Sequence, residues 1–206
     1  MVAASVLMCA TQAAAALSDA PDVAGGPRFV DYPTRPGGPA PRFDFTRLDG
    51  APAPPVRHIA DAVAGLSPPA QLQAVNARVN RVPTRDDREN YGVDDYWATP
   101  AEFFRRGGDC EDFAIAKYAV LERLGWPAAQ MWIVVLRETV ISPVHAVLMV
   151  RHAGRLWTLD NLADPVVEHG RIDWYRPAYS LNRFGTWSHG GALTLAGQRR
   201  AAPTGR

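Results

Sequence analysis

The hydrophobic pattern of this chain changes its period near Gly125, and that change limits the possible folds more than any other feature. Before this glycine, apolar residues recur at helical spacing in two segments, residues 56–81 and 110–124. After it come runs typical of β-strands, at residues 131–136, 144–150 and 155–160. Helices first and antiparallel strands afterwards predict an α+β fold.

The chain of 206 residues is long enough for one domain with a substantial core. Residues 1–16 are apolar and alanine-rich, which predicts a secretory signal peptide. The segment lacks the Lys or Arg residues that normally begin such a peptide, which a start codon placed too late would explain. We predict a disordered lead-in rich in Pro and Gly at 17–55, the folded domain at 56–189 and a disordered tail at 190–206.

Charge and cysteine content exclude several functions. The formal net charge is +1 and no basic stripe is interleaved with aromatic residues, so nucleic acid is not an expected partner. Removal of the signal peptide would take Cys9 with it and leave Cys110 as the single cysteine, which excludes an internal disulfide. The scattered histidines show no zinc-ligand spacing.

Cys110 follows two glycines and an aspartate at the predicted start of a helix. Asp109 is placed to cap that helix, with Asp112 as a partner in an arrangement like a capping box. A helix N-terminus lowers the pKa of a cysteine, whereas the neighbouring carboxylates of Asp109 and Glu111 raise it. A reactive thiolate here would therefore need a compensating positive charge; the alternative is a small buried apolar residue without chemistry.

His145 begins one predicted strand and Asp160 ends the next. A hairpin symmetric about residues 152 and 153 places the two side chains directly opposite each other, and a bulge at Gly154 would shift them by one position. Either register lets the carboxylate orient the imidazole, as a Cys-His-Asp triad requires. The alternative is a polar pair at the end of a hairpin with no chemical role.

Other polar and aromatic residues have weaker contexts. The backbone N–H of Cys110 would contribute to an oxyanion hole, with Trp97 as a second donor or a wall of the site, or else as a core aromatic. The acidic pairs at 86–87 and 94–95 are expected to be solvated loop charge.

Four segments in order resemble the bacterial transglutaminase-like cysteine proteinases, whose best-understood branch is the LapG type. They are DDYWATPAEF from residue 94, GDCEDFAIAKY from 108, HAVL from 145 and LDNL from 159. The resemblance covers roughly residues 57–187 and implies a papain/transglutaminase-like fold, with the nucleophile at a helix N-terminus packed on an antiparallel sheet. It places the catalytic triad on Cys110, His145 and Asp160.

The resemblance also implies a cofactor, partners and a location. LapG-type enzymes are periplasmic and need calcium, which acidic residues beside the nucleophile help to bind; here these are Asp109 and Glu111, with Asp112 as a possible addition. Oxygen ligands suit calcium, and no organic cofactor is expected. Such enzymes cut a large surface adhesin after a pair of alanines, which releases biofilm cells, and an inner-membrane receptor for cyclic di-GMP sequesters them.

Three alternatives stay open. Attack of an amine in place of water on the acyl-enzyme would make the protein a transglutaminase-type acyltransferase. A stand-alone peptidase or amidase acting on another envelope substrate would use the same triad. A non-catalytic binding module would keep the fold alone, although the intact triad argues against it.

Overall fold

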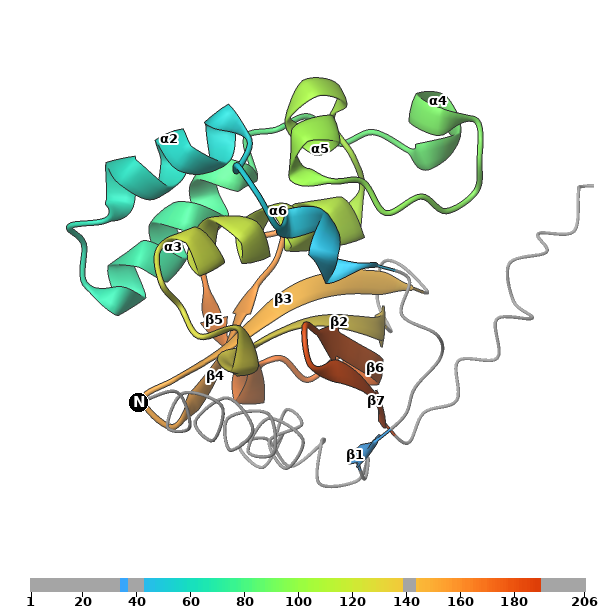
Figure 1. Ribbon diagram of the computed structural model, residues 1–206. Helices are drawn as coiled ribbons and strands as arrows, with labels where there is room; N and C mark the ends of the chain where they lie inside the picture. Colours follow the sequence, from blue (N-terminus) through green and yellow to red (C-terminus); the bar gives the residue numbers. More distant parts are fainter. Residues whose placement is uncertain (1–33, 37–42, 139–143, 190–206) are drawn as a thin grey trace, which may run out of the picture.

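The computed structural model describes residues 34–36, 43–138 and 144–189. A layer of helices covers one face of an antiparallel sheet (Figure 1), which confirms the predicted α+β class. The predicted signal peptide and the predicted tail lie outside the described residues. Among the described residues, no helix has both the length and the apolar character needed to cross a membrane.

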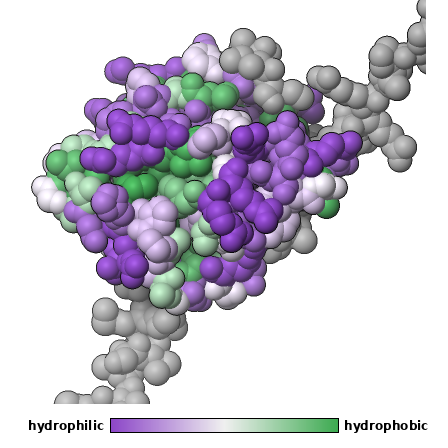
Figure 2. Space-filling view, turned by 90° about the horizontal axis from the view of Figure 1, so that it is seen from above, coloured by the Kyte–Doolittle hydropathy of each residue, from purple (hydrophilic) through white to green (hydrophobic). Residues whose placement is uncertain are grey.

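The helical layer comes mainly from the first half of the domain. Its helices are α2 (Pro54–Val63), α3 (Pro68–Val79), α4 (Asp87–Tyr91), α5 (Pro100–Arg106) and α6 (Cys110–Arg123), with 3₁₀ turns at Phe45–Leu48, Ala128–Gln130 and His169–Arg171. Most of the surface seen from the helical side is hydrophilic, and an apolar band lies over the half that α2 and α3 occupy (Figure 2).

The sheet is formed almost entirely by the second half. Its strands are β1 (Thr34–Pro36), β2 (Met131–Glu138), β3 (His145–His152), β4 (Arg155–Leu159), β5 (Val167–Glu168), β6 (Tyr175–Asn182) and β7 (Gly185–His189). Within the described residues they follow the order β1-β7-β6-β2-β3-β4-β5, and all neighbours are antiparallel. The predicted strands correspond to β2, β3 and β4.

The two faces of the sheet carry different apolar sets, as the period of two in a strand requires. On β3, Ala146, Leu148 and Val150 belong to the main core, which the helices cover. Val147 and Met149 belong to a second apolar cluster that is built around Trp132 and Trp187. Apolar residues on both faces explain why β3 reads as a continuous hydrophobic run.

The β3–β4 hairpin has a different register from the predicted one. Its turn is the pair Ala153–Gly154, with φ of 51° and 73°, so both residues are in the left-handed region that favours two-residue hairpin loops. Leu148 therefore pairs with Leu159, whereas the predicted symmetry would pair it with Trp157. Both registers proposed from the sequence are wrong.

Two predictions for loop segments are also wrong. Phe43 and Phe45 are buried in the main core, β1 pairs with β7, and α2 already begins at Pro54, so these parts of the predicted disordered lead-in are structured. The loop predicted from Pro83 to Asp95 contains α4, whose N-cap Asp86 accepts a hydrogen bond from the backbone of Arg88. Buried aromatic residues order the first segment, and the helix N-cap at Asp86 orders the second.

Candidate active site

Cys110 is the first residue of α6, as predicted, and two glycines shape the approach to it. Gly107 ends α5 with a φ of +81°, which only glycine adopts readily. A Cβ on Gly108 would lie 2.2 Å from Oδ2 of Asp112. The glycine pair therefore lets the backbone turn tightly against the first turn of α6 and leaves space for a carboxylate there.

The Cys110 side chain is partly accessible and lies in an acidic setting. Its Sγ donates a hydrogen bond to Oε2 of Glu111 at 3.2 Å. Burial raises the pKa of the thiol well above its ordinary value, the charges of Glu111 and Asp109 raise it further, and a backbone hydrogen bond from Ala146 opposes them. This contact also brings the thiol against the residue that follows His145.

His145 and Asp160 form a buried pair, with Nε2 of the imidazole 2.9 Å from Oδ1 of the carboxylate. Asp160 directly follows Leu159, the last paired residue of β4. The observed register makes the two residues diagonal neighbours on one face rather than direct cross-strand partners. The predicted contact is thus present, although the predicted register is wrong.

Three further donors fix the Asp160 residue. The backbone N–H of Leu162 donates to Oδ1 at 2.9 Å, and the hydroxyl of Tyr175 on β6 donates to Oδ2. Asn80, which caps the end of α3, donates to the backbone oxygen of Asp160 at 2.9 Å. Burial would raise the pKa of the Asp160 carboxyl, but the hydrogen bond and charge of His145, with the bonds from Leu162 and Tyr175, hold it below its ordinary value.

A ladder of amide side chains on α3 holds the loop after Asp160. Asn76 donates to the backbone oxygens of Ala163 and Asp164, both at 2.8 Å. Gln73 donates to Asp164 at 2.8 Å and accepts from the backbone N–H of Val166 at 3.0 Å. The helical spacing of 73, 76 and 80 puts the three amides on one face, but sequence reasoning singled out only the apolar face of this helix.

Trp97 does not present a free donor to the site. Its indole Nε1–H donates to Oδ1 of Asp95 at 3.0 Å, and the side chain is buried in the main core. The predicted role as a second oxyanion donor is therefore wrong for this structure, and the alternative of a core aromatic describes the side chain.

Five acidic residues gather around the start of α6, and we call them the acidic cluster: Asp87, Asp95, Asp109, Glu111 and Asp112. Carboxylate oxygens of Asp87, Asp95 and Glu111 lie within 4.8 Å of one another, and so do those of Asp87, Asp109 and Asp112. Of the three residues predicted as metal ligands, Asp109 and Asp112 share one group and Glu111 belongs to the other, and Asp87 is common to both.

Asp87 and Asp95 were expected to be solvated loop charge, and for Asp87 this is wrong. Asp87 is 2% exposed, and its Oδ2 accepts from the backbone N–H of Tyr96. A bridge between Thr84 and Gly108 ties its loop to the start of α6. Only this tertiary contact brings Asp87 to the cluster, so no sequence pattern could have identified it.

The predicted capping box at α6 is only half formed. Asp109 occupies the N-cap position, but its side chain makes no capping hydrogen bond. Asp112 uses Oδ1 to accept from the backbone N–H of Ala98 at 2.7 Å. Asp112 also accepts a hydrogen bond from the backbone N–H of Asp109, so the Asp112 half of the box is present and the Asp109 half is not.

The acidic cluster fits a divalent cation. One buried oxygen on each of Asp87, Asp109 and Asp112 has no hydrogen-bond partner among the described residues. Burial and neighbouring carboxylates raise the pKa of Asp109 to about 6 and that of Asp112 to about 8. Buried like charges with spare oxygen lone pairs are the donor set that calcium prefers.

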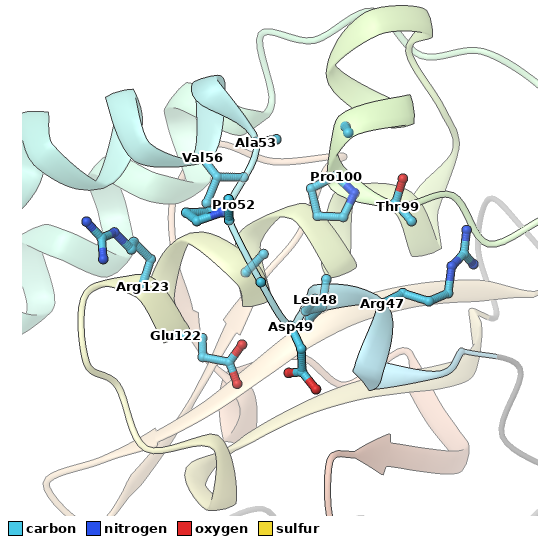
Figure 3. Close-up of a pocket in the computed structure, with 14 residues that line it drawn as sticks. Arg47, Leu48, Asp49, Pro52, Ala53, Val56, Thr99, Pro100, Glu122 and Arg123 are labelled. Carbon is cyan, nitrogen blue, oxygen red and sulfur yellow. The ribbon is translucent and has the colours of Figure 1, made fainter.

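A pocket of about 320 Å³ lies elsewhere, beside the C-terminal half of α6. Apolar side chains such as Pro52, Val56 and Pro100 line it, and Arg47 and Arg123 lie at opposite sides of it (Figure 3). No residue of the predicted triad lines this pocket.

Comparison with known proteins places this site in a family. The sequence model of one protein family, the bacterial transglutaminase-like cysteine proteinases, matches residues 59–187. No match is found among curated proteins. Among solved structures, calcium-bound LapG of Legionella pneumophila is 31% identical with a TM-score of 0.59, over 65% of this chain and 76% of that one.

Two further structures of the same protein are similar. LapG of Legionella pneumophila without a stated ligand and the EGTA-treated form are each 31% identical with a TM-score of 0.58, over 65% of this chain and 74% of theirs. The family match spans most of the domain and includes Cys110, His145 and Asp160. The chain therefore belongs to the bacterial transglutaminase-like cysteine proteinases, a family of cysteine peptidases.

Proposed function

We propose that this protein is a periplasmic, calcium-dependent protease that uses Cys110, His145 and Asp160 to cleave a large surface adhesin and so controls biofilm attachment. The hydrogen-bonded His145–Asp160 pair, with Cys110 at the helix start beside it, is the observation that carries the catalytic assignment. The similarity to LapG supports the substrate, and the predicted signal peptide supports the location.

The hydrogen bond to Asp160 supports a separate role for each imidazole nitrogen. Nε2 of His145 faces the Asp160 carboxylate, so this nitrogen carries the proton that the carboxylate accepts. Nδ1 is then the base that takes the thiol proton of Cys110. Asp160, held by Leu162 and Tyr175, keeps the imidazole in that tautomer and stabilises the imidazolium that forms.

The reaction is acyl transfer in two steps. The Cys110 thiolate attacks the peptide carbonyl, and the imidazolium of His145 gives its proton to the leaving amine. Water, deprotonated by His145, then hydrolyses the thioester. The backbone N–H groups in the first turn of α6 are suited to stabilise the oxyanion.

The acidic cluster would hold the calcium ion. Asp87, Asp109 and Asp112 offer buried oxygens that find no partner within the described part of the chain, while Glu111 and Asp95 complete the set. Bound calcium would supply positive charge beside the thiol, where the surrounding carboxylates otherwise raise its pKa. The calcium-bound and EGTA-treated forms of LapG support this proposal.

The catalytic proposal is tested with an N-terminal fragment of a candidate adhesin and with envelope proteins from the source cells, both incubated with the purified protein. New N-termini found by mass spectrometry are expected with the parent protein and absent with Cys110→Ala. A Cys110→Ala protein that cuts as well as the parent would overturn the nucleophile assignment. Isopeptide cross-links in place of new termini would show transamidation.

The calcium proposal has a readout that does not depend on activity. At 100 times the dissociation constant, calcium should stabilise the fold by about 2.7 kcal/mol, measured as a rise in melting temperature that excess chelator removes. Asp112→Asn should abolish this rise, whereas Asp61→Asn, which changes an exposed aspartate of α2, should preserve it. An equal calcium-dependent rise in melting temperature in both variants would show that the acidic cluster is not the calcium site.

A further inference from the structure

Lys117 is the single lysine of this chain. The 22 Lys and Arg residues are otherwise all arginines. An ammonium group is a compact charge that loses its proton readily when buried, whereas a guanidinium stays charged and presents several donors. The one lysine lies in α6 and is 1% exposed. Lysine is almost never buried to this extent without a partner, so the position calls for an explanation.

Lys117 has no direct polar partner that would explain its burial. Within the described part of the chain its Nζ forms no hydrogen bond or ion pair, and it lies 5.8 Å from the centroid of the Phe113 ring. Two carboxylates, those of Asp160 and Asp164, are near enough for their charges to act on it. Methionine would fill a similar space without the cost of burying a charge. The fold therefore carries a costly group beside its proposed catalytic carboxylate, and such groups cluster at functional sites.

The helical layer brings Lys117 to this place from two directions. It follows Cys110 by seven residues, which is nearly two full turns, so the two side chains share one face of α6. α6 packs against both β3 and α3. From α3, Asn80 donates to the backbone oxygen of Asp160 at 2.9 Å and to Oδ1 of Asp164 at 3.2 Å. Two adjacent helices thus act on the same two aspartates.

We propose that Lys117 is a positioning residue of the active site, whose buried ammonium fixes the charge that Asp160 presents to His145. The proposal rests on the protease function above and adds to its triad a residue that acts through Asp160 and does not contact the substrate. The carboxylates of Asp160 and Asp164 with one ammonium leave a net charge of −1, the same as one carboxylate alone. Without the ammonium, the two carboxylates would repel each other in the loop behind the imidazole.

The pH dependence of the reaction should report this charge. Lys117 is charged below a pKa of about 7, and a nearby positive charge favours the ionised form of Asp160. Removing the ammonium therefore raises the pKa of the Asp160 carboxyl, which then loses its charge at a higher pH. A protonated Asp160 cannot stabilise the imidazolium of His145, so the acid limb of the pH profile should move to higher pH.

The neighbouring elements contribute further groups that the test must hold constant. α3 faces the loop with the amides of Asn76 and Asn80, which do not titrate. Saturating calcium would hold the acidic cluster at the start of α6. The titratable groups that border Lys117 or Asp160 are Asp164 in the loop after β4, His145 on β3 and Tyr175 on β6. All of them stay unchanged in the variants compared by kinetics.

The kinetic experiment compares the parent with Lys117→Met, Lys117→Arg and Arg123→Met on a cleaved adhesin peptide, at saturating calcium from about pH 4.5 to 8. In Lys117→Met, the ratio of kcat/KM at pH 5 to that at pH 7 should fall about three- to tenfold, with KM little changed at pH 7. Lys117→Arg keeps the charge and should keep the ratio of the parent. Arg123→Met removes an exposed charge from the last turn of the same helix and is the matched control.

A second measurement does not depend on cleavage. Since Lys117 is the only lysine, protein labelled with lysine that carries ¹⁵N at Nζ gives one signal, which follows the pKa of this group directly. Asp160→Asn and Asp164→Asn each remove a negative charge that favours the ammonium, so each should lower the pKa of Lys117 further. Asp61→Asn, which changes an exposed aspartate of α2, should leave it unchanged.

The possible failures are distinguishable. Parallel pH profiles of Lys117→Met and the parent, or a Lys117 pKa that neither loop variant lowers, would overturn this inference and leave the proposed protease function intact. Absence of any cleavage by the parent would overturn the protease function, and the Nζ signal would still decide whether Lys117 and Asp160 are coupled. If Lys117→Arg is too large to fold, the comparison of Lys117→Met with Arg123→Met decides the kinetic question alone.

Discussion

Tyr175 contacts the proposed catalytic carboxylate, Asp160, from a strand that the chain reaches only after the β4–β5 region. It is 4% exposed, and its hydroxyl donates to Oδ2 of Asp160 while His145 holds Oδ1. A hydrogen bond to a charged group is worth about 1.5–3 kcal/mol. Tyr175 is therefore a positioning residue, because it contacts Asp160 and acts through that residue.

Tyr175→Phe should lower kcat by about tenfold with KM little changed, because the carboxylate loses a donor that fixes its orientation toward His145. Steady-state kinetics on a peptide substrate measures the two parameters, and ¹⁵N NMR of the imidazole should show a change in the tautomer balance of His145. Tyr118→Phe is the control, since Tyr118 is a buried tyrosine of α6 that packs on Phe45. Equal kcat in the two variants would contradict the role.

Gly108 is required by close packing rather than by backbone conformation. Gly108→Ala would place a methyl group 2.2 Å from Oδ2 and 2.7 Å from Cβ of Asp112, so the carboxylate must move. We expect a loss of about 1–3 kcal/mol of stability together with weaker calcium binding.

Thermal melts and calcium titration calorimetry test this prediction. Gly65→Ala is the control because a Cβ there would meet nothing within 4 Å. Unchanged calcium affinity in Gly108→Ala would show that Asp112 tolerates the displacement.

At the scale of elements, α3 joins the helical layer to the loop that follows β4. Its amide ladder bonds to the backbone of residues 160, 163, 164 and 166. Asn76 is fully buried, and its two hydrogen bonds to the loop are part-buried. The helix therefore supports the catalytic carboxylate through its loop, beyond its apolar packing in the core.

Asn76→Ala should cost about 1–3 kcal/mol, since two hydrogen bonds to the carbonyls of Ala163 and Asp164 are lost, and should also lower kcat by loosening the Asp160 loop. Gln71→Ala is the matched control on the same helix, because its amide bonds to Trp126 and to the backbone of Ala64, away from that loop. We expect the control to lose stability without losing kcat. Denaturant unfolding and kinetics of both proteins separate the two effects.

At the scale of the whole molecule, a buried lysine makes stability depend on pH. Lys117 is 1% exposed in α6. Burial lowers its pKa from 10.5 to about 7, against the charges of Asp160 and Asp164, which raise it. Between these two values the unfolded chain binds more protons than the folded one, so the contribution of Lys117 to stability rises with pH.

Lys117→Met should remove this part of the pH dependence. The difference in unfolding free energy between variant and parent should favour the variant most at pH 6 and shrink as the pH rises from 7 toward 10. Denaturant titrations at saturating calcium measure this difference without changing the state of the acidic cluster. A difference that does not vary with pH would contradict the lowered pKa.

Local patterns identified the proposed catalytic residues because their signals lie close together in the chain. Helical spacing after two glycines placed Cys110 at the start of α6, and the spacing of two strands brought His145 near Asp160. The precise pairing could not be predicted, because it depends on Ala153 and Gly154 both taking left-handed conformations. The sequence shows a glycine at that turn but does not show which residues form the loop.

Sequence alone thus determined the helix-then-strand order and the place of Cys110 at the start of α6, since each depends on residues within about one element. It also indicated the family, through four short segments in order. Only tertiary structure brought Asp87 and Tyr175 to the site and moved Phe43 into the core. Their places depend on a bridge to Gly108, on the order of strands in the sheet and on packing against residues far along the chain. Such contacts are set by the free energy of the whole fold, which no local pattern records.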